Sequence, residues 1–137
     1  CWFLVDLDNT LYEGKQALGH ANWFYDELQQ RMDAGKSREE AFKEFYPDWI
    51  KSQWICAVKP LEESAIPLIQ DLQKHNVVVM GFTHRQPPIA DATIKQVSSL
   101  DLDFSLTAPC VSFQSLPASG GPTCYKQGIF FAGDYHQ

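Results

Sequence analysis

The apolar positions of this chain fall into short continuous runs and longer stretches with helical spacing. The continuous runs cover residues 2–5, 77–82 and 129–132. Runs of this kind are typical of parallel strands buried on both faces, whereas apolar residues three or four apart indicate helices. Strands that alternate with helices predict an α/β fold, here a Rossmann-like parallel sheet with its functional site at the carboxyl ends of the strands.

The stretch between the first two strands, residues 16–58, is predicted to be a helical insertion. Its apolar residues recur at helical spacing from Ala21 to Met32, and Gly35 is placed to end that helix. Ser37 and Glu40 form a capping box that predicts the start of a second helix. Pro47 is expected to stop this helix, and Asp48 to cap a short third one. The predicted division is an α/β core of residues 1–15 and 59–137, incomplete at its C-terminal end, with a helical cap of residues 16–58.

The remainder of the core is read in the same way. A helix is expected from Pro60 to about His75, with a kink or restart at Pro67. Pro87 and Pro88 are expected to introduce another helix. Residues 102–104 are predicted to form a strand, and residues 109–125 a long loop or an irregular hairpin.

Two carboxylates follow the first apolar run directly. Asp6 and Asp8 are two residues apart, so in an extended segment their side chains point the same way. Two anions at that separation repel each other unless a cation or a shared proton lies between them. Mg²⁺ suits such a site, because it binds hard oxygen ligands and keeps waters that a phosphate can replace. The alternative is a strand that ends in an acidic turn.

A second polar segment follows the second apolar run. Thr83, His84 and Arg85 come directly after residues 77–82, which places Thr83 at the same sheet edge as Asp6. Arg85 is suited to contact a phosphate or carboxylate of a substrate. His84 is either a substrate contact or an ordinary loop histidine.

The string Asp6-Leu7-Asp8-Asn9-Thr10 after an apolar run resembles motif I of the haloacid dehalogenase (HAD) superfamily, and Thr83 resembles its motif II. The resemblance implies a Mg²⁺-dependent phosphohydrolase that acts on a phosphomonoester through an aspartyl-phosphate. Asp6 would be the nucleophile, Asp8 the general acid and then the base, and both would bind the metal, Asp8 through its carbonyl. Thr10 would support the site, and Thr83 would bind a phosphate oxygen. Together with the segment 128–133, Thr83-His84-Arg85 looks similar to an uncharacterised bacterial branch of that superfamily.

The later motifs of that pattern are missing from the sequence. Lys95 and Lys126 lie at the wrong places to supply the expected lysine, and Asp134 does not follow a suitable further strand. A HAD-like binding protein without turnover is therefore an alternative function. Dehalogenation of a haloacid is a further alternative, but Asp8 argues against it because a halide leaving group needs no acid.

The composition limits the kinds of partner and of cellular location that can be expected. A net charge of −6 argues against nucleic acid, and the predicted partner is a small-molecule phosphate ester. No run approaches the roughly 18 apolar residues of a membrane span, so a soluble protein is expected, cytoplasmic or, with a leader upstream, periplasmic or secreted. The four cysteines lack C-x-x-C spacing and are expected to be scattered thiols, although Cys110 and Cys124 could bracket a loop.

Overall fold

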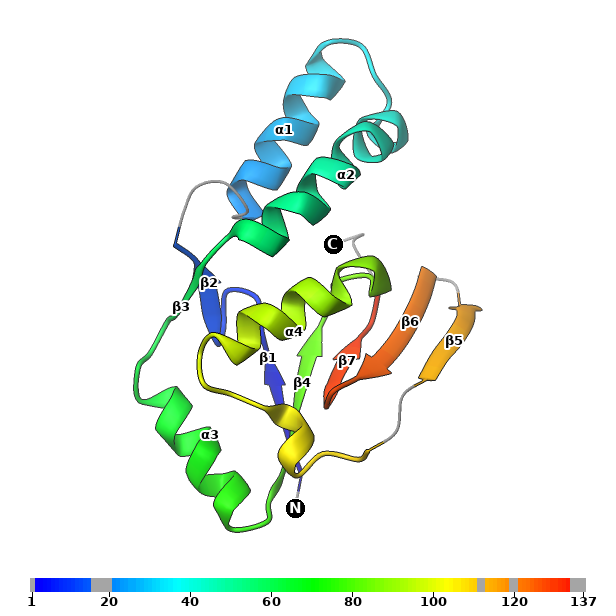
Figure 1. Cartoon of the computed structure of the whole chain (residues 1–137). Helices are drawn as coiled ribbons and strands as arrows, with labels where there is room; N and C mark the ends of the chain where they lie inside the picture. The colour runs from blue at the N-terminus through cyan, green and yellow to red at the C-terminus, as the bar shows by residue number, and fades with distance from the viewer. Residues whose placement is uncertain (1, 16–20, 111–112, 119–120, 134–137) are drawn as a thin grey trace.

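A computed structural model of the chain describes residues 2–15, 21–110, 113–118 and 121–133 (Figure 1). It contains a five-stranded sheet, a two-stranded sheet and four α-helices. The elements in chain order, with η for a 3₁₀ turn, are β1 (Trp2–Asp6), β2 (Tyr12–Gly14), α1 (Ala21–Asp33), α2 (Arg38–Ile55), β3 (Val58–Pro60), α3 (Ala65–Lys74), β4 (Val78–Thr83), η1 (Pro87–Ile89), α4 (Ala90–Ser98), η2 (Phe104–Leu106), β5 (Phe113–Ala118), β6 (Gly121–Lys126) and β7 (Ile129–Phe131).

The main sheet is mixed, with the strand order β1-β4-β7-β6-β5. Strands β1, β4 and β7 are parallel, whereas β6 and β5 are antiparallel. The predicted α/β class is confirmed. The predicted parallel pairing holds for β1, β4 and β7. Strands β5 and β6, which lie where a long loop or an irregular hairpin was predicted, pair antiparallel and join the sheet beside β7.

One face of the sheet is covered by helices and forms the main core. Val79, Gly81 and Thr83 of β4 are buried on this face. A Cβ atom added to Gly81 would lie 3.1 Å from Ile129 and 3.2 Å from Phe104, so the glycine allows η2 to approach the strand closely. In Figure 1, α4 and η2 lie in front of the sheet, and α3 lies at the lower left, beside β1.

The segment predicted as a cap contains two helices, α1 and α2, which pack against each other. Gly35 has a φ of 101° just after α1, and Ser37 caps α2 by accepting a hydrogen bond from the Glu40 N–H at 3.1 Å. Both helix boundaries are therefore confirmed. The two helices share an apolar core of their own, formed by Phe24, Leu28, Ala41, Phe45 and Trp49.

Pro47 does not end the second helix, so that prediction and the capping role of Asp48 are wrong. Helix α2 continues without a break to Ile55. Proline removes one backbone hydrogen bond and crowds the preceding turn. The buried rings of Phe45 and Trp49, on either side of Pro47, hold the helix against α1 and outweigh this local cost.

Three other local predictions need correction. Pro60 belongs to β3, which pairs with β2, and neither short strand was predicted. Helix α3 begins only at Ala65, so Pro67 lies in its first turn, where a missing N–H costs little and no kink is needed. Residues 102–104 do not form a strand. Asp103 accepts a hydrogen bond from the Ser105 N–H at 2.9 Å and starts η2 instead.

Cys110 and Cys124 are free thiols, one exposed and one buried, so the bracketed-loop alternative is not formed. Within the ranges that the structure describes, no helix is both long and apolar enough to cross a membrane.

Candidate functional site

The predicted acidic residues lie at the carboxyl ends of β1 and β4. Asp6 is the last residue of β1, and the next N–H, that of Leu7, donates to the Phe82 carbonyl at 3.1 Å. The chain then turns tightly, because the N–H groups of Leu11 and Tyr12 both donate to the Leu7 carbonyl, at 3.0 and 3.2 Å. This turn places Asp8 opposite the end of β4.

The Asp6 side chain is exposed and has one close partner. Thr10 donates its hydroxyl hydrogen to Asp6 Oδ2 at 2.7 Å. Thr10 thus contacts Asp6 directly, and its supporting role in the site stays a prediction. This hydrogen bond orients the carboxylate, while the exposure of Asp6 leaves it open to a ligand.

The Asp8 side chain is bound on both oxygens. Arg85 donates from Nη2 to Asp8 Oδ1 at 2.6 Å and from Nε to both carboxylate oxygens at 3.0 Å. Thr83 donates to Asp8 Oδ2 at 2.9 Å. The Arg85 side chain is only 8% exposed and that of Asp8 is 38% exposed, so solvent reaches the Asp8 carboxylate but hardly the Arg85 guanidinium. Charge-assisted pairs of this geometry fix orientation as well as supplying energy.

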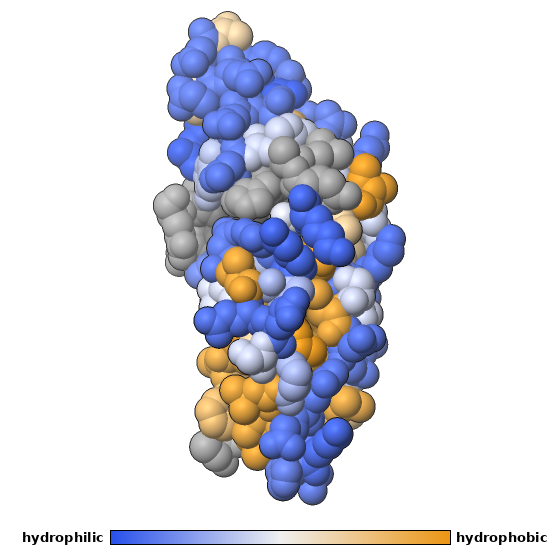
Figure 2. Space-filling model, turned by 90° about the vertical axis from the view of Figure 1, so that its left-hand side faces the viewer, coloured by the Kyte–Doolittle hydropathy of each residue, from blue (hydrophilic) through white to orange (hydrophobic). Residues whose placement is uncertain are grey.

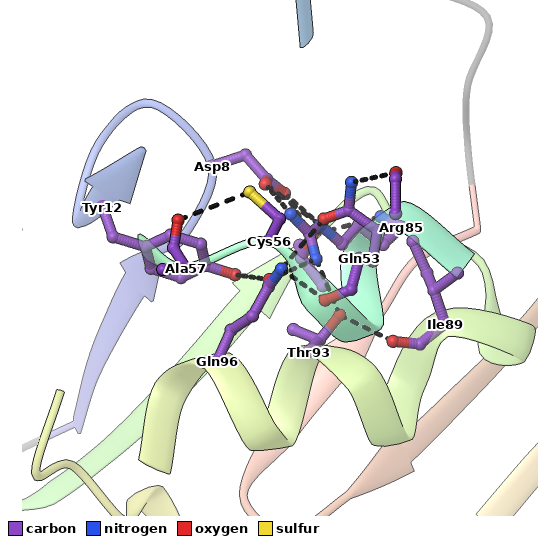
Figure 3. A network of polar contacts seen from close by, with 11 residues as sticks. Asp8, Tyr12, Gln53, Cys56, Ala57, Arg85, Ile89, Thr93 and Gln96 are labelled. Carbon is purple, nitrogen blue, oxygen red and sulfur yellow. Dashed lines mark hydrogen bonds and ion pairs between the residues drawn. The ribbon is translucent and has the colours of Figure 1, made fainter. Parts of the chain in front are cut away.

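The other end of the Arg85 guanidinium enters a buried polar network (Figure 3). Its Nη1 donates to Thr93 Oγ1 at 3.0 Å and to Gln96 Oε1 at 2.8 Å. Gln96 in turn donates from Nε2 to the backbone carbonyl and the side-chain oxygen of Gln53, at 3.0 and 3.1 Å. The network therefore connects β4, α4 and the end of α2.

Tyr12 closes the network on the side of β2. Its ring is buried, and the Arg85 guanidinium lies 5.9 Å from the ring centroid. Burial raises the pKa of Tyr12 well above its usual value, Arg85 lowers it in part, and Asp8 raises it again. The Tyr12 hydroxyl thus stays protonated at neutral pH, and it donates to Gln96 Oε1 at 3.5 Å.

The structure brings the six predicted site residues together in three arrangements. Asp8, Thr83 and Arg85 form one cluster, and Asp6 and Thr10 form an adjacent pair. The His84 ring packs edge-on against Phe82, with centroids 5.3 Å apart. Arg85 points inward to Asp8 and α4, so a direct substrate contact by Arg85 would need a different side-chain conformation.

Sequence reasoning missed Tyr12 and three further members of this network. Gln53, Thr93 and Gln96 are buried polar residues on helices. Thr93 and Gln96 are three residues apart, on the side of α4 that also buries Ala92 and Val97. A polar pair on an otherwise apolar helix face is the signal that could have indicated them.

The donor set fits a magnesium ion in part. Within the described residues, no three His, Cys, Asp or Glu side chains are grouped to hold a metal. Asp6 offers an exposed carboxylate, whereas both Asp8 side-chain oxygens already accept hydrogen bonds. Mg²⁺ is commonly bound through one or two carboxylates plus waters and substrate phosphate. Among these side chains Asp6 is therefore the carboxylate that could hold an ion, with water or a phosphate as further ligands. Asp134 lies outside the described residues.

The fold and the site define a mixed α/β protein with an acid–arginine–threonine cluster at the ends of its parallel strands. The whole chain, residues 1–137, matches the model of the family described as "Protein of unknown function (DUF2608)", and the chain belongs to that family.

Curated relatives come from Chlamydia and carry the name "Putative outer membrane protein". The Chlamydia trachomatis serovar D protein is 30% identical over 136 residues, which is 99% of this chain and 50% of the relative. The Chlamydia pneumoniae protein is 34% identical with the same coverage. The chain thus spans about half the length of the curated relatives it matches. No solved structure matches the chain.

These comparisons correct the resemblance drawn from the sequence. The matching family is DUF2608, and the curated relatives bear no HAD name, so the assignment to the HAD superfamily is wrong. The resemblance rested on short motifs of Asp and Thr after apolar strands. Such motifs specify a local geometry, and that geometry alone does not establish a family.

Proposed function

We propose that the protein is a Mg²⁺-dependent phosphohydrolase that acts on a small phosphomonoester through Asp6. The observation that carries the proposal is the meeting of two acids and a threonine at one sheet edge. Asp6 ends β1, and Asp8 accepts from Thr83, the last residue of β4, at 2.9 Å. Open α/β sheets usually bind ligands at the carboxyl ends of their strands. The position of these three residues at such ends therefore favours a Rossmann-like core.

Asp6 is proposed to act as the nucleophile. Its carboxylate would attack phosphorus, the bond to the leaving oxygen would break, and an aspartyl-phosphate would form. A water molecule would then attack that intermediate, release phosphate and restore Asp6. Covalent catalysis of this kind divides one difficult transfer into two easier ones. Bound Mg²⁺ would supply positive charge that offsets the charge of the phosphoryl group.

Asp8 is proposed to give a proton to the leaving oxygen and later to take one from water. At present both of its oxygens accept hydrogen bonds from Arg85 and Thr83. Proton donation therefore requires at least one of these contacts to open. Asp8 is part exposed, so substrate can reach it and replace a contact.

The α1–α2 hairpin is proposed to act as a cap that selects substrate. It contacts the core through Gln53 and through the Trp54 carbonyl, which accepts from Lys95 Nζ at 2.9 Å. These contacts lie at the end of α2 nearest the site. Substitutions on the hairpin should therefore change the preference among substrates more than the turnover of a small aryl phosphate.

Turnover of para-nitrophenyl phosphate with Mg²⁺ tests the proposal. Asp6→Asn removes the nucleophile with little change in shape, and we expect its rate to fall to background. Asp26→Asn, an exposed acid on α1, is the matched control and should keep the rate. An Asp6→Asn protein that hydrolyses the ester nearly as fast as the unchanged chain would refute the assignment.

The role of Asp8 is tested by comparing leaving groups. General acid catalysis contributes on the order of 10²- to 10⁴-fold, and it matters most when the leaving oxygen is basic. Asp8→Asn should therefore slow an alkyl phosphate far more than para-nitrophenyl phosphate. An equal loss of hydrolysis rate for both esters would contradict the role of Asp8 as the general acid.

A second candidate function is a binding protein that holds a phosphate ester without turnover. The tight Asp8–Arg85 pair favours it, because three donor groups already occupy the carboxylate that a phosphatase would need as its acid. Calorimetric titration with inorganic phosphate and Mg²⁺ distinguishes the two. Binding with no hydrolysis of any tested monoester would favour this candidate over the enzyme.

The location of the full-length protein is also a proposal. The relatives named "Putative outer membrane protein" suggest that the full-length protein resides in the cell envelope, outside the cytoplasm. Fractionation of cells that produce a tagged full-length protein tests this. Recovery in the cytosolic fraction alone would contradict it.

A further inference from the structure

The second face of strands β1, β4 and β7 is apolar, and no helix of the described residues lies over it (Figure 1). Along β4, alternate residues point to opposite faces, and Val78, Met80 and Phe82 lie opposite the buried set. In the parallel register Trp2 pairs with Val78 and Leu4 with Met80, so these side chains share that face. Trp2 is 64% exposed and Leu4 is 67% exposed.

The apolar surface continues across the sheet and ends beside the candidate site. Phe130 of β7 pairs with Phe82, and their rings stack at 6.0 Å between centroids. Asp6 pairs with Phe82 on the other side, so the carboxyl end of this face borders the exposed acid. We call the surface formed by Trp2, Leu4, Val78, Met80, Phe82 and Phe130 the open face.

Figure 2 looks at the molecule from the side on which β1 forms the sheet edge, and apolar residues gather in the lower part of that view. Parallel strands are normally buried on both faces, because helices cover each side. Here α3 and α4 cover only the face that carries Val79, with which Ile69 and Val97 form the main core (Figure 1). Contiguous exposed apolar residues mark sites that contact another polypeptide, a membrane or a ligand.

We propose that the open face is covered by helices from the part of the full-length polypeptide that lies outside the matched span. The curated relatives are about twice as long as this chain, so a segment of similar length is available in the same polypeptide. A covalently attached segment has a high effective concentration at this face. Helices are the expected occupant because they cover the faces of parallel strands. Apart from Asp6, which pairs with Phe82 at the carboxyl end of this face, the residues of the open face carry no charge, which suits an apolar helix stripe.

The proposal is tested by thiol accessibility in a full-length protein. Residues 1–137 replace the matched half of the Chlamydia trachomatis relative, with Cys1→Ser and Cys110→Ser as background. Leu4→Cys reports on the open face. Leu106→Cys is the matched control, because Leu106 is 68% exposed, is also leucine and lies on η2 away from that face. Labelling by a maleimide is timed for both variants.

We expect Leu4→Cys to be labelled at least tenfold more slowly than Leu106→Cys in a monomer. Equal labelling rates would overturn the proposal. If Leu4→Cys were labelled slowly in a dimer and fast after dilution to the monomer, a second copy would cover the open face. That result would also overturn the proposal. Fast labelling that slows only with phosphatidylcholine vesicles would assign the face to lipid, with the same consequence.

A second measurement avoids dependence on the chimera. Hydroxyl-radical footprinting of the unmodified Chlamydia trachomatis protein reports the exposure of the positions aligned with Trp2, Leu4 and Met80. Low oxidation there, compared with the position aligned with Leu106, is the expected result. Oxidation at all four positions alike in a monomer would overturn the proposal even if the chimera failed to fold.

Discussion

The α1–α2 hairpin and the Arg85 network lie next to each other but are stabilised in different ways. The hairpin core is formed by aromatic rings, such as Phe24 against Trp49 and Trp23 against Phe45, each pair with centroids 4.8 Å apart. The network consists of directional contacts between buried polar groups. Apolar packing depends on volume, whereas a buried polar network depends on every partner being in place. Substitutions should therefore affect the two regions differently.

The largest expected effect is on the hairpin. Phe45 is 1% exposed, and Phe45→Ala should destabilise the fold by about 4 kcal/mol, in the range for deleting a buried phenylalanine ring. Urea unfolding measures the change. Tyr25→Ala is the control, because Tyr25 is 51% exposed, and its loss should stay below about 1 kcal/mol. Similar losses for the two variants would show that the rings do not form a packed core.

The next effect concerns the network. Arg85→Met keeps much of the side-chain volume but removes the guanidinium that donates to Asp8, Thr93 and Gln96. We expect a loss of about 3 kcal/mol, at the low end for a broken buried pair because Asp8 is part exposed.

The control for the network is an arginine on the hairpin. Arg31 bonds to Glu27 and Glu44 at the surface, and Arg31→Met should cost less than about 1 kcal/mol. If Arg31→Met lowered the free energy of unfolding as much as Arg85→Met in the same experiment, the buried network would contribute no more to stability than a surface ion pair.

A smaller effect of opposite sign is expected at Pro47. It is exposed in the middle of α2, and alanine there would restore an N–H donor and relieve crowding of the preceding turn. Pro47→Ala should raise the free energy of unfolding by about 1 to 3 kcal/mol. Lys51→Ala, also exposed on α2, should change it by less than about 0.5 kcal/mol. A destabilised Pro47→Ala protein would mean that the proline is needed for the hairpin geometry.

The smallest effect is confined to alkaline pH. Burial raises the pKa of Tyr12 in the folded state, while the unfolded value stays near about 10. The unfolded chain then loses this proton first, so the stability contributed by Tyr12 is present below about pH 10 and falls as the pH rises further. Tyr12→Phe should show a shallower loss of stability above that pH. Phenolate absorbance of Tyr12 at pH 10 in the folded protein would contradict this account.

Much of the fold could be predicted from local patterns. The runs that became β1, β4 and β7 are continuous and apolar. Gly35 marked the end of α1 by its backbone conformation, and Ser37 marked the start of α2 by its capping side chain. Pro47 was misread because tertiary packing decided the outcome. The β2–β3 pair was not predicted, because its strands have three residues each and are too short to show a periodic pattern.

The candidate site was predictable only in its composition. Asp6, Asp8 and Thr83 are indicated by their positions after strands. The inward direction of Arg85 is not, because it depends on Thr93 and Gln96, which meet it only after α4 packs on the sheet. The open face was likewise hidden, since a continuous apolar run predicts burial on both sides and says nothing about which segment supplies each side.

Direct detection of the covalent intermediate tests the central claim. The full chain is mixed with Mg²⁺ and an aryl phosphate, quenched in acid within the first turnover, and digested for mass spectrometry. The account predicts a phosphoryl group on the peptide that contains Asp6, absent from the Asp6→Asn protein and present in the Asp26→Asn protein. Hydrolysis of the ester with no phosphoryl group on that peptide, or with one on another residue, would contradict the account.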